Sequence, residues 1–445
     1  MLEHIDRLGD ICTVCWPMYA AMPAVLKKAV LRAYEQCGWN LYKSVNKTGT
    51  DIFPSFVDLL MELESAINES AYSEEVKGNY IGSLVTRVES LTNGINGEIF
   101  SSNEISDDVL FDQNTIIDLS RIGAQETKSL IMGILIMRLN EHRMVKANKA
   151  NAGLRHLTIL EEAHNILKRT STEQSMEGSN VAGKSVEMLI NSIAEMRTYG
   201  EGFVIVDQSP TSVHAAAIKN TNTKIIMRLP DGDDRRIAGK SAALRDDQVD
   251  EIAKLPTGVA IIYQNDWLQP VMGKITMANI ERCPYQENPD AQQVDDTEIP
   301  LTEILKLLLK GRLSRQEEPD LVAIESGLVK GKIPTSTKIR ILSLVKEYRE
   351  TGQLTIWDND NFVELSKLIV KLTGLSQKVL DIAAKASSFD ELNSILTSLL
   401  SETQFVPDYM NLTLRQVLMR DYAERGTSEL KIYNAWLNDI KSKMQ

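Results

Sequence analysis

The sequence is poor in cysteine and has no long apolar run. Four of its 445 residues are cysteine, namely Cys12, Cys15, Cys37 and Cys283. So few thiols behind a polar amino terminus exclude a disulfide-rich secreted domain and predict the reducing cytoplasm. No apolar run approaches the ~20 residues that cross a bilayer, so we expect no membrane-spanning segment.

Metal-binding and nucleophile patterns are also missing. Cys12 and Cys15 have the spacing of half a zinc site, but no second pair follows. Buried structural thiols are therefore the favoured interpretation. The five histidines form no Ser-His-Asp or zinc-protease pattern.

The chain carries a net charge of −12. This balance argues against a protein that coats nucleic acid with its whole surface. It leaves open a motor whose basic groups line only an inner channel, because binding depends on the local patch. The length suggests about three domain-sized units.

Helical patterns dominate the first part of the chain. An amphipathic stretch, Met22–Gln36, begins next to Pro23 and ends at Cys37-Gly38. Further helices are predicted at Ser55–Asn68 and from about Glu74 to Leu91.

Short apolar runs then alternate with helical patterns such as Ala124–Arg143. The five runs are Asn114–Leu119, Leu157–Leu160, Gly202–Gln208, Lys224–Leu229 and Gly258–Tyr263. This alternation predicts an α/β fold with a mainly parallel sheet that is covered on both faces.

Four parts are expected along the chain. Residues 1–113 form a helical insertion that belongs to the α/β core of residues 114–283. A polar, proline-bearing linker, residues 284–300, follows. Residues 301–445 show only helical spacing of apolar positions, which predicts an all-helical carboxyl-terminal domain.

The run Leu157–Leu160 ends abruptly in Glu161 and Glu162. Open α/β sheets bind ligands at the carboxyl ends of their strands, and unpaired buried carboxylates are costly. One acid holding a hard cation and the other facing a water would resolve that cost, as in a Walker B element. A strand end with simply solvated acids is an equally open interpretation.

Gln208 ends the next strand and is a candidate to orient the attacking water, although a local turn residue is an equal alternative. Arg228, Arg235 and Arg236 are candidates to stabilise phosphoryl charge from a neighbouring subunit. For each arginine a salt bridge to a nearby aspartate is the simpler alternative.

The segment Gly178–Ser185 matches the phosphate-loop pattern. A phosphate loop follows a buried strand, whereas the preceding residues 169–177 are polar. The match also follows the paired acids rather than preceding them. We therefore interpret it, and the weaker Gly239-Lys240-Ser241, as coincidental.

Three motifs in order resemble the HerA-like ATPases, which belong to a class of ring-forming DNA translocases with FtsK and the VirB4 motors. They are Ile159–Asn165, Glu195–Gly200 and Val204–Pro210, and the segments Trp16–Pro23, Asn220–Leu229 and Leu255–Gly258 fit as well. The resemblance covers roughly residues 10–280 and leaves out the helical tail.

The resemblance implies a RecA-like core, a hexameric homo-oligomeric ring and hydrolysis of ATP with Mg²⁺ coupled to movement along DNA, double-stranded DNA being expected in the channel. Glu161 takes the metal position, Glu162 the general base and Gln208 the sensor. Arg228 stays a candidate catalytic residue, and which arginine acts in trans is left open. Asp118 and His164 support the nucleotide site. Arg169 and Lys184 flank a loop that would touch DNA phosphates.

One part of the family pattern is missing. Before Asn114 the sequence has no apolar strand followed by a phosphate loop, and the family's amino-terminal β-barrel is absent too. We therefore expect the carboxyl-terminal part of a larger motor, or a partner chain that supplies the loop, and little activity alone. Two alternatives are a phage-defence or mobile-element motor with an effector nuclease, and a non-hydrolysing scaffold.

Overall fold

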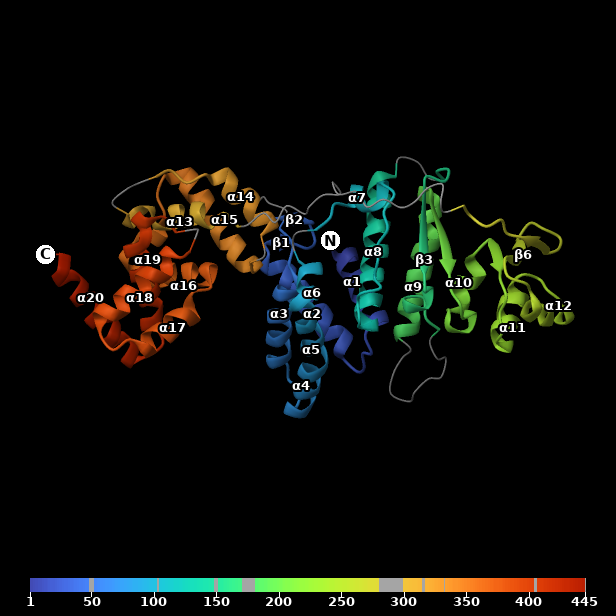
Figure 1. Cartoon of the computed structure of the whole chain (residues 1–445), viewed down its shortest axis with the longest axis horizontal. Helices are drawn as coiled ribbons and strands as arrows, with labels where there is room; N and C mark the ends of the chain where they lie inside the picture. Colours follow the sequence, from blue (N-terminus) through green and yellow to red (C-terminus); the bar gives the residue numbers. More distant parts are fainter. Residues whose placement is uncertain are drawn as a thin grey trace. The chain divides into compact units, whose positions relative to one another are not determined.

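The computed structural model describes residues 1–47, 52–101, 104–147, 151–169, 181–279, 299–313, 317–331, 333–403 and 406–444. Figure 1 shows the elements in chain order. They form two compact units: unit 1 is Met1–Lys28 with Ile105–Gln292, and unit 2 is Ala29–Glu104 with Gln293–Gln445. The domain limits expected from the sequence stay a prediction.

Unit 1 has a core of long helices. Its helices are α1 (Leu2–Cys15), the start of α2 (Met22–Gln36), α7 (Asp107–Asp112), α8 (Gln125–Lys146), α9 (Val181–Glu195), α10 (Ala215–Asn220), α11 (Gly232–Ser241) and α12 (Asp246–Glu251). Helix α1 packs against both α8 and α9. The approach is close at Gly133, where a Cβ atom would lie 2.5 Å from Ile11 Cγ2. Any larger residue at position 133 would separate the two helices.

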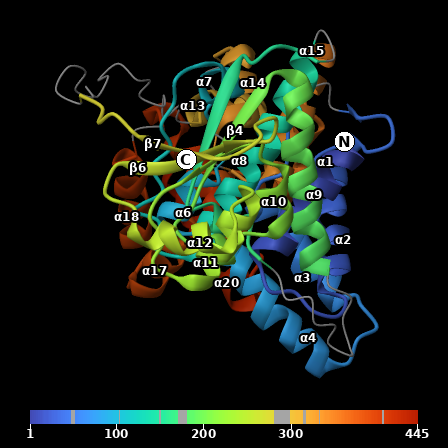
Figure 2. The ribbon, with the colours of Figure 1, turned by 90° about the vertical axis from the view of Figure 1, so that its right-hand side faces the viewer.

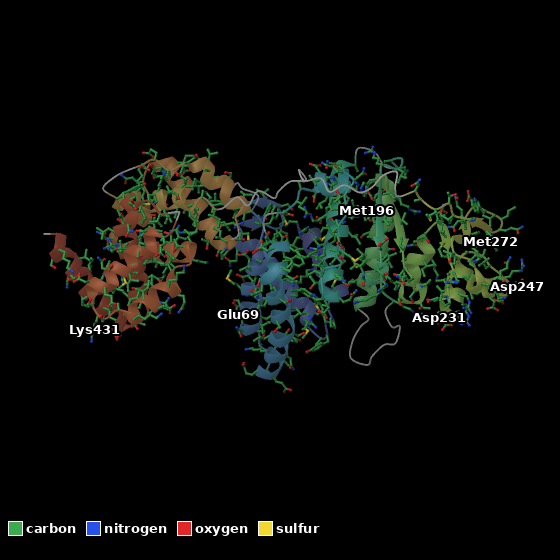
Figure 3. The ribbon with its side chains drawn as sticks, in the orientation of Figure 1. Glu69, Met196, Asp231, Asp247, Met272 and Lys431 are labelled. Carbon is green, nitrogen blue, oxygen red and sulfur yellow. The ribbon has the colours of Figure 1, made fainter. Side chains whose placement is uncertain are left out.

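The strand that carries the paired acids forms as predicted. Strand β3 (His156–Glu161) pairs in parallel with β4 (Glu201–Val206), from His156 opposite Glu201 to Glu161 opposite Val206. Figures 1 and 2 show this pair beside α8 and α9. Before β4 the buried Met196, labelled in Figure 3, and Gly200 (φ +87°) turn the chain into the strand.

A second sheet follows in the same unit. Strands β5 (Thr223–Ile226), β6 (Val259–Gln264) and β7 (Val271–Lys274) pair antiparallel in that order. Apolar residues of β5 and β6 pack with α11 and α12 around Ala242 and Ile252, both fully buried. The described strands of unit 1 are thus one parallel pair and one antiparallel sheet of three strands. The fold is α/β, but the predicted mainly parallel sheet is wrong for the described residues, because β5, β6 and β7 pair antiparallel in a sheet of their own. The strands predicted at 202–208, 224–229 and 258–263 are confirmed within a few residues.

The strand predicted at Asn114–Leu119 is wrong. These residues form no strand, and Ile116 and Ile117 are 79% and 44% exposed. An extended segment becomes a strand only when its backbone groups pair with a neighbour. Here the Asp118 carboxylate instead accepts the Ser120 N–H at 2.8 Å, so the segment ends in a local turn.

The prediction that the sheet is covered on both faces is also wrong. On one face of the β3–β4 pair Leu157 and Ile159 are 49% and 60% exposed, and Val204 and Val206 beside them are exposed as well. The apolar composition reflects two apolar faces, but among the described residues only the face with Leu160 is covered. The strands are therefore more apolar than their burial by the described residues requires.

Unit 2 is helical, as predicted for the carboxyl-terminal part. Its first helices are α3 (Phe56–Asn68), α4 (Glu74–Tyr80), the π turn Ile81–Val85, α5 (Thr86–Thr92) and α6 (Gly94–Ile99), after the short hairpin β1 (Trp39–Asn40) and β2 (Val45–Asn46). The others are α13 (Leu301–Leu309), α14 (Leu321–Lys330), α15 (Thr335–Thr351), α16 (Phe362–Thr373), α17 (Ser376–Lys385), α18 (Phe389–Ser401), α19 (Asn411–Ala423) and α20 (Thr427–Met444). The helices predicted near 22–36, 55–68 and 74–91 are confirmed.

One buried carboxylate joins distant parts of unit 2. Asp58 in the first turn of α3 accepts hydrogen bonds from the Ser55 cap and from the Thr335 N–H at 2.9 Å. Thr335 begins α15, and its hydroxyl also donates to Asp58. The buried Lys338 lies nearby, and burial lowers the pKa of its ammonium group against the opposing effect of Asp58. This polar contact is one link between residues almost 280 positions apart.

The cysteines are buried as predicted. Cys12, Cys15 and Cys37 are free thiols with at most 4% exposure, and Cys283 lies outside the described residues. Burial raises the pKa of Cys12 and of Cys37 to about 12, so both stay protonated and unreactive at neutral pH. None of the described helices is long and apolar enough to span a membrane.

A buried ion network fixes the amino end of the β3–β4 pair. The Glu201 carboxylate is fully buried and accepts from Arg143 Nε at 2.8 Å and from Thr158 Oγ1 at 2.6 Å. It also pairs with His156 Nδ1 at 2.8 Å. Arg143 extends the network to Asp112 of α7 at 2.6 Å. Helix α8 is thereby joined to both strands.

We predict that Glu201→Ala lowers the free energy of unfolding by about 3–5 kcal/mol, because it removes one of the two carboxylates that compensate the buried Arg143 guanidinium and leaves its Nε without a partner. Urea denaturation of the purified chain measures this. The control is Glu251→Ala, which breaks an exposed pair with Lys254 and should cost less than about 1 kcal/mol. Equal losses in the two variants would contradict the role given to Glu201.

Candidate functional site

The paired acids lie at the carboxyl end of β3. Glu161 is the last strand residue, and Glu162 adopts a left-handed conformation with φ 50° and ψ 50°. A 3₁₀ turn, Ala163–Asn165, follows at once. The left-handed backbone costs a residue with a Cβ atom roughly 1–2 kcal/mol. Such strain persists where surrounding structure imposes it, and it is concentrated at functional sites.

Gln208 contacts one acid of the pair, and its role as a sensor stays a prediction. Its Nε2 atom donates to Glu162 Oε1 at 2.9 Å. The contact follows from the parallel register, because Glu161 stands opposite Val206 and both chains continue past the same edge. At this distance the amide and the carboxylate are bonded directly, and their remaining polar atoms can both contact one water molecule beside the pair.

A third carboxylate, that of Asp207, was missed from the sequence. Asp207 Oδ2 accepts from the His164 backbone N–H at 2.8 Å and lies 2.9 Å from His164 Nδ1. Its other oxygen accepts the Ser209 N–H at 2.9 Å. The same His164 nitrogen lies 3.5 Å from Glu162 Oε2. Asp207 therefore positions the imidazole ring next to Glu162. Its place directly after β4 was the sequence signal that could have identified it.

The two acids are not buried, so the cost of burying unpaired carboxylates gives no reason to expect a cation at them. Glu161 and Glu162 are both exposed, and the Glu162 side chain retains 48% of its accessible surface. Water solvates the two carboxylates, as in the simpler interpretation of the pattern. The reason is the uncovered face of the β3–β4 pair, on which Glu161 follows Leu157 and Ile159.

Two other predicted site residues are not brought to the acids by any described contact. Asp118 is fully exposed and bonds within its own turn, and hydrogen bonds from Ser120 lower the pKa of its carboxyl group. Arg228 follows β5 and is exposed, with no hydrogen bond to the acids among the described residues. Their assigned roles stay predictions.

The neighbouring arginines have local partners. Arg236 forms the expected salt bridge, with NH1 2.9 Å from Asp233. Arg235 instead donates to the carbonyl oxygen of Pro230 at 2.5 Å. Asp231, labelled in Figure 3, caps α11 by accepting the N–H groups of its first turn.

The phosphate-loop match is partly outside the described residues, which resume at 181. Gly183, Lys184 and Ser185 lie within the first turns of α9. Ser185 is 3% exposed, and its hydroxyl bonds to Asp10 of α1 at 3.3 Å. A phosphate loop presents this hydroxyl to a metal ion. Here the Ser185 hydroxyl is turned to Asp10 of α1 instead of to a metal ion, in agreement with the interpretation of the phosphate-loop match as coincidental.

Glu161 is exposed and takes part in no described ion pair, and its assignment as the metal ligand stays a prediction. Asp108, Asp112 and His142 also approach within 4.8 Å of one another. In that cluster Lys146 and Arg143 already neutralise the carboxylates. Burial opposes ionisation of Asp112, yet hydrogen bonds from these cations outweigh it and lower its pKa. The cluster is therefore an ion-pair network rather than a metal site.

We predict that Glu162→Gly raises the free energy of unfolding by up to about 1 kcal/mol, because glycine removes the left-handed strain. The control is Glu162→Gln, which keeps the Cβ atom and the strain and should leave stability unchanged. Thermal and urea unfolding of the two variants give the comparison. A less stable Glu162→Gly protein would show that the backbone at position 162 is not strained.

No family profile matches the sequence. Among curated proteins, the chain is 22% identical over 254 residues to the DNA double-strand break repair helicase HerA of Sulfurisphaera tokodaii, covering 56% of this chain and 48% of that one. It is 26% identical over 187 residues to a probable helicase of Methanocaldococcus jannaschii, covering 40% and 34%. The matched region thus spans about half or less of these relatives.

Among solved structures, VirB4 of Thermoanaerobacter pseudethanolicus is similar with a TM-score of 0.41 and 14% identity, over 63% of this chain and 70% of that one. At this score the two structures share too little for residues to be equated. The sequence comparisons confirm the resemblance drawn from the motifs: over about half of its length the chain is similar to HerA-like helicases.

Proposed function

We propose that this chain supplies the acid side of an ATP-hydrolysing site in a HerA-like DNA translocase. The observation that carries the proposal is the 2.9 Å contact of Gln208 with Glu162 at the shared edge of two parallel strands. Glu162 is the general base for the attacking water, and Gln208 orients that water. Glu161 holds Mg²⁺ through its hydration shell.

His164 and Asp207 position the base. The Asp207 carboxylate contacts His164 twice, at the backbone N–H and at Nδ1 of the imidazole ring, and the ring borders Glu162. This arrangement directs the Glu162 carboxylate toward Gln208 while it remains accessible to water. In the proposed motor the chain forms a RecA-like ring, a hexamer by resemblance, in the cytoplasm around DNA, with Arg228 acting on the neighbouring subunit's nucleotide.

The phosphate loop is proposed to come from a further strand. Among the described residues β4 pairs only with β3, and β5 only with β6, so both strands have a free edge. The Thr211 N–H in the 3₁₀ turn after β4 donates to Asp234 of α11 at 2.8 Å, which joins the segment that follows β4 to the helix that follows β5. A strand between β4 and β5 would satisfy both edges and deliver a phosphate loop beside the acids.

We predict that purified residues 1–445 hydrolyse ATP only weakly with Mg²⁺ and that Lys184→Ala leaves this rate unchanged. The reason is that Lys184 lies within helix α9 rather than in a phosphate-binding loop, and the hydroxyl of the adjacent Ser185 donates to Asp10 of α1. Phosphate release measures the rate. Strong activity that is abolished by Lys184→Ala would overturn the interpretation of Gly178–Ser185 as coincidental.

We further predict that, in the complex isolated from the native host, Glu162→Gln lowers kcat by about 10²–10⁴-fold, since it removes the general base. Glu251→Gln, exposed on α12, is the matched control. Unchanged ATPase activity in Glu162→Gln would favour the non-hydrolysing scaffold. A nuclease recovered in the same complex would favour the defence-system alternative.

A further inference from the structure

A cavity of about 420 Å³ lies between helices α1, α8 and α9 of unit 1. The three helices pack on one another. The cavity reaches the surface, because the exposed Glu3 and Glu195 lie on its wall. Its lining residues do not include Glu161, Glu162 or Gln208. The cavity is therefore separate from the candidate site.

The lining residues follow one side of two helices. On α1 they recur at steps of three and four residues between Glu3 and Val14. On α9 they recur in the same way between Ser185 and Glu195. Such steps place side chains on one face of a helix, and ten residues of helix rise about 15 Å. The cavity is therefore an elongated groove, the α1–α9 groove.

The floor of the α1–α9 groove is apolar. Ile11 of α1, Ile136 of α8 and Leu189 of α9 line it and are buried. Met188, which precedes Leu189 and also lines the groove, is 53% exposed. The thioether of methionine is flexible and adapts to a bound surface, so methionine is common where proteins bind partners. The floor is thus an apolar contact surface that includes a side chain open to water.

Four carboxylates line the groove, and two of them already have a cation. Glu3 and Asp6 form ion pairs with Arg or Lys side chains at 2.7 and 2.6 Å. Asp10 of α1 and Glu195 of α9 take part in no ion pair among the described residues. One carboxylate on each of these helices can therefore pair with a cation from another molecule.

The surroundings of Asp10 favour such a cation. Its side chain is half-buried and accepts a hydrogen bond from the Ser185 hydroxyl at 3.3 Å. Burial, together with the nearby charge of Asp6, raises the pKa of the Asp10 carboxyl group against the opposing effect of this hydrogen bond. An approaching cation stabilises a partly buried carboxylate in its charged form. A ligand that suits the groove is therefore both apolar and positively charged.

We propose that the α1–α9 groove binds an amphipathic helix of a partner protein. The apolar stripe of that helix lies on Met188 and Leu189. Its Lys or Arg side chains pair with Asp10 and Glu195, because their long stems can lie on apolar surface while the charge stays at the rim. A second copy of this chain suits the groove less well, since the chain itself carries a net charge of −12. This binding does not depend on hydrolysis at the acid pair.

Fluorescence anisotropy of the full chain with a fluorescein-labelled peptide tests the groove. The peptide consists of about fourteen Leu and Lys residues, with Leu at helical spacing. Asp10→Asn/Glu195→Gln should bind it about tenfold more weakly, because both cation contacts are lost. The matched control Glu187→Gln/Asp250→Asn removes two exposed carboxylates that do not line the groove, and it should bind as the original chain does.

Met188→Glu separates apolar contact from attraction between charges. An added carboxylate would strengthen purely electrostatic binding, whereas a charge on the apolar floor should weaken binding of the helix about tenfold. A scrambled peptide of the same composition lacks the apolar stripe and should also bind about tenfold more weakly.

Four results would overturn the proposal. They are absence of peptide binding, a double variant equal to its control, equal or tighter binding by Met188→Glu, and equal binding of the scrambled peptide. Self-association of the original chain that Met188→Glu abolishes would assign the groove to a second copy and would overturn it as well. Peptide binding that persists in Glu162→Gln keeps this result independent of the proposed hydrolysis.

Discussion

The parallel register of β3 with β4 is the constraint on which the candidate site depends. Both strands are anchored at their amino ends by Glu201, whose buried charge is compensated by Arg143 of α8. A slip of one residue would place this carboxylate on the opposite face and separate it from its partners. The anchored register is what carries Glu162 and Gln208 past the same sheet edge to a 2.9 Å contact. A buried ion pair at one end thus sets the geometry at the other.

Local signals in the sequence predicted much of this arrangement. Helix α2 begins and ends where Pro23 and Gly38 indicated, because the residues next to a helix determine where it starts and stops. The acid pair and Gln208 were found because each ends an apolar strand. The left-handed backbone of Glu162 could not be predicted, since it is imposed by the turn that follows β3. Nor could the contact of Asp207 with His164, which depends on how two strands are aligned.

The wrong predictions share one cause. Asn114–Leu119 has the composition of a strand, and Leu157 and Ile159 have the composition of a buried one. Composition records what a segment can bury, whereas pairing and burial need a second element at the right place. In the described residues that element is missing on one face of β3–β4 and along the free edges of β4 and β5. Apolar side chains exposed together in this way indicate a surface made for contact.

This exposure bears directly on the chemistry of the acids. Two unit charges 4 Å apart interact by about 1 kcal/mol in water and by about 4 kcal/mol at the effective dielectric of a protein surface. With its side chain 48% exposed, Glu162 stands close to the first situation. Stabilising charge on a transferred phosphoryl group requires fixed dipoles and exclusion of water. An element that covered Leu157, Ile159 and Val204 would bury this face of the sheet and would also reduce the access of water to Glu162, so the same contact would change both the stability of the strand pair and the electrostatics of the proposed base.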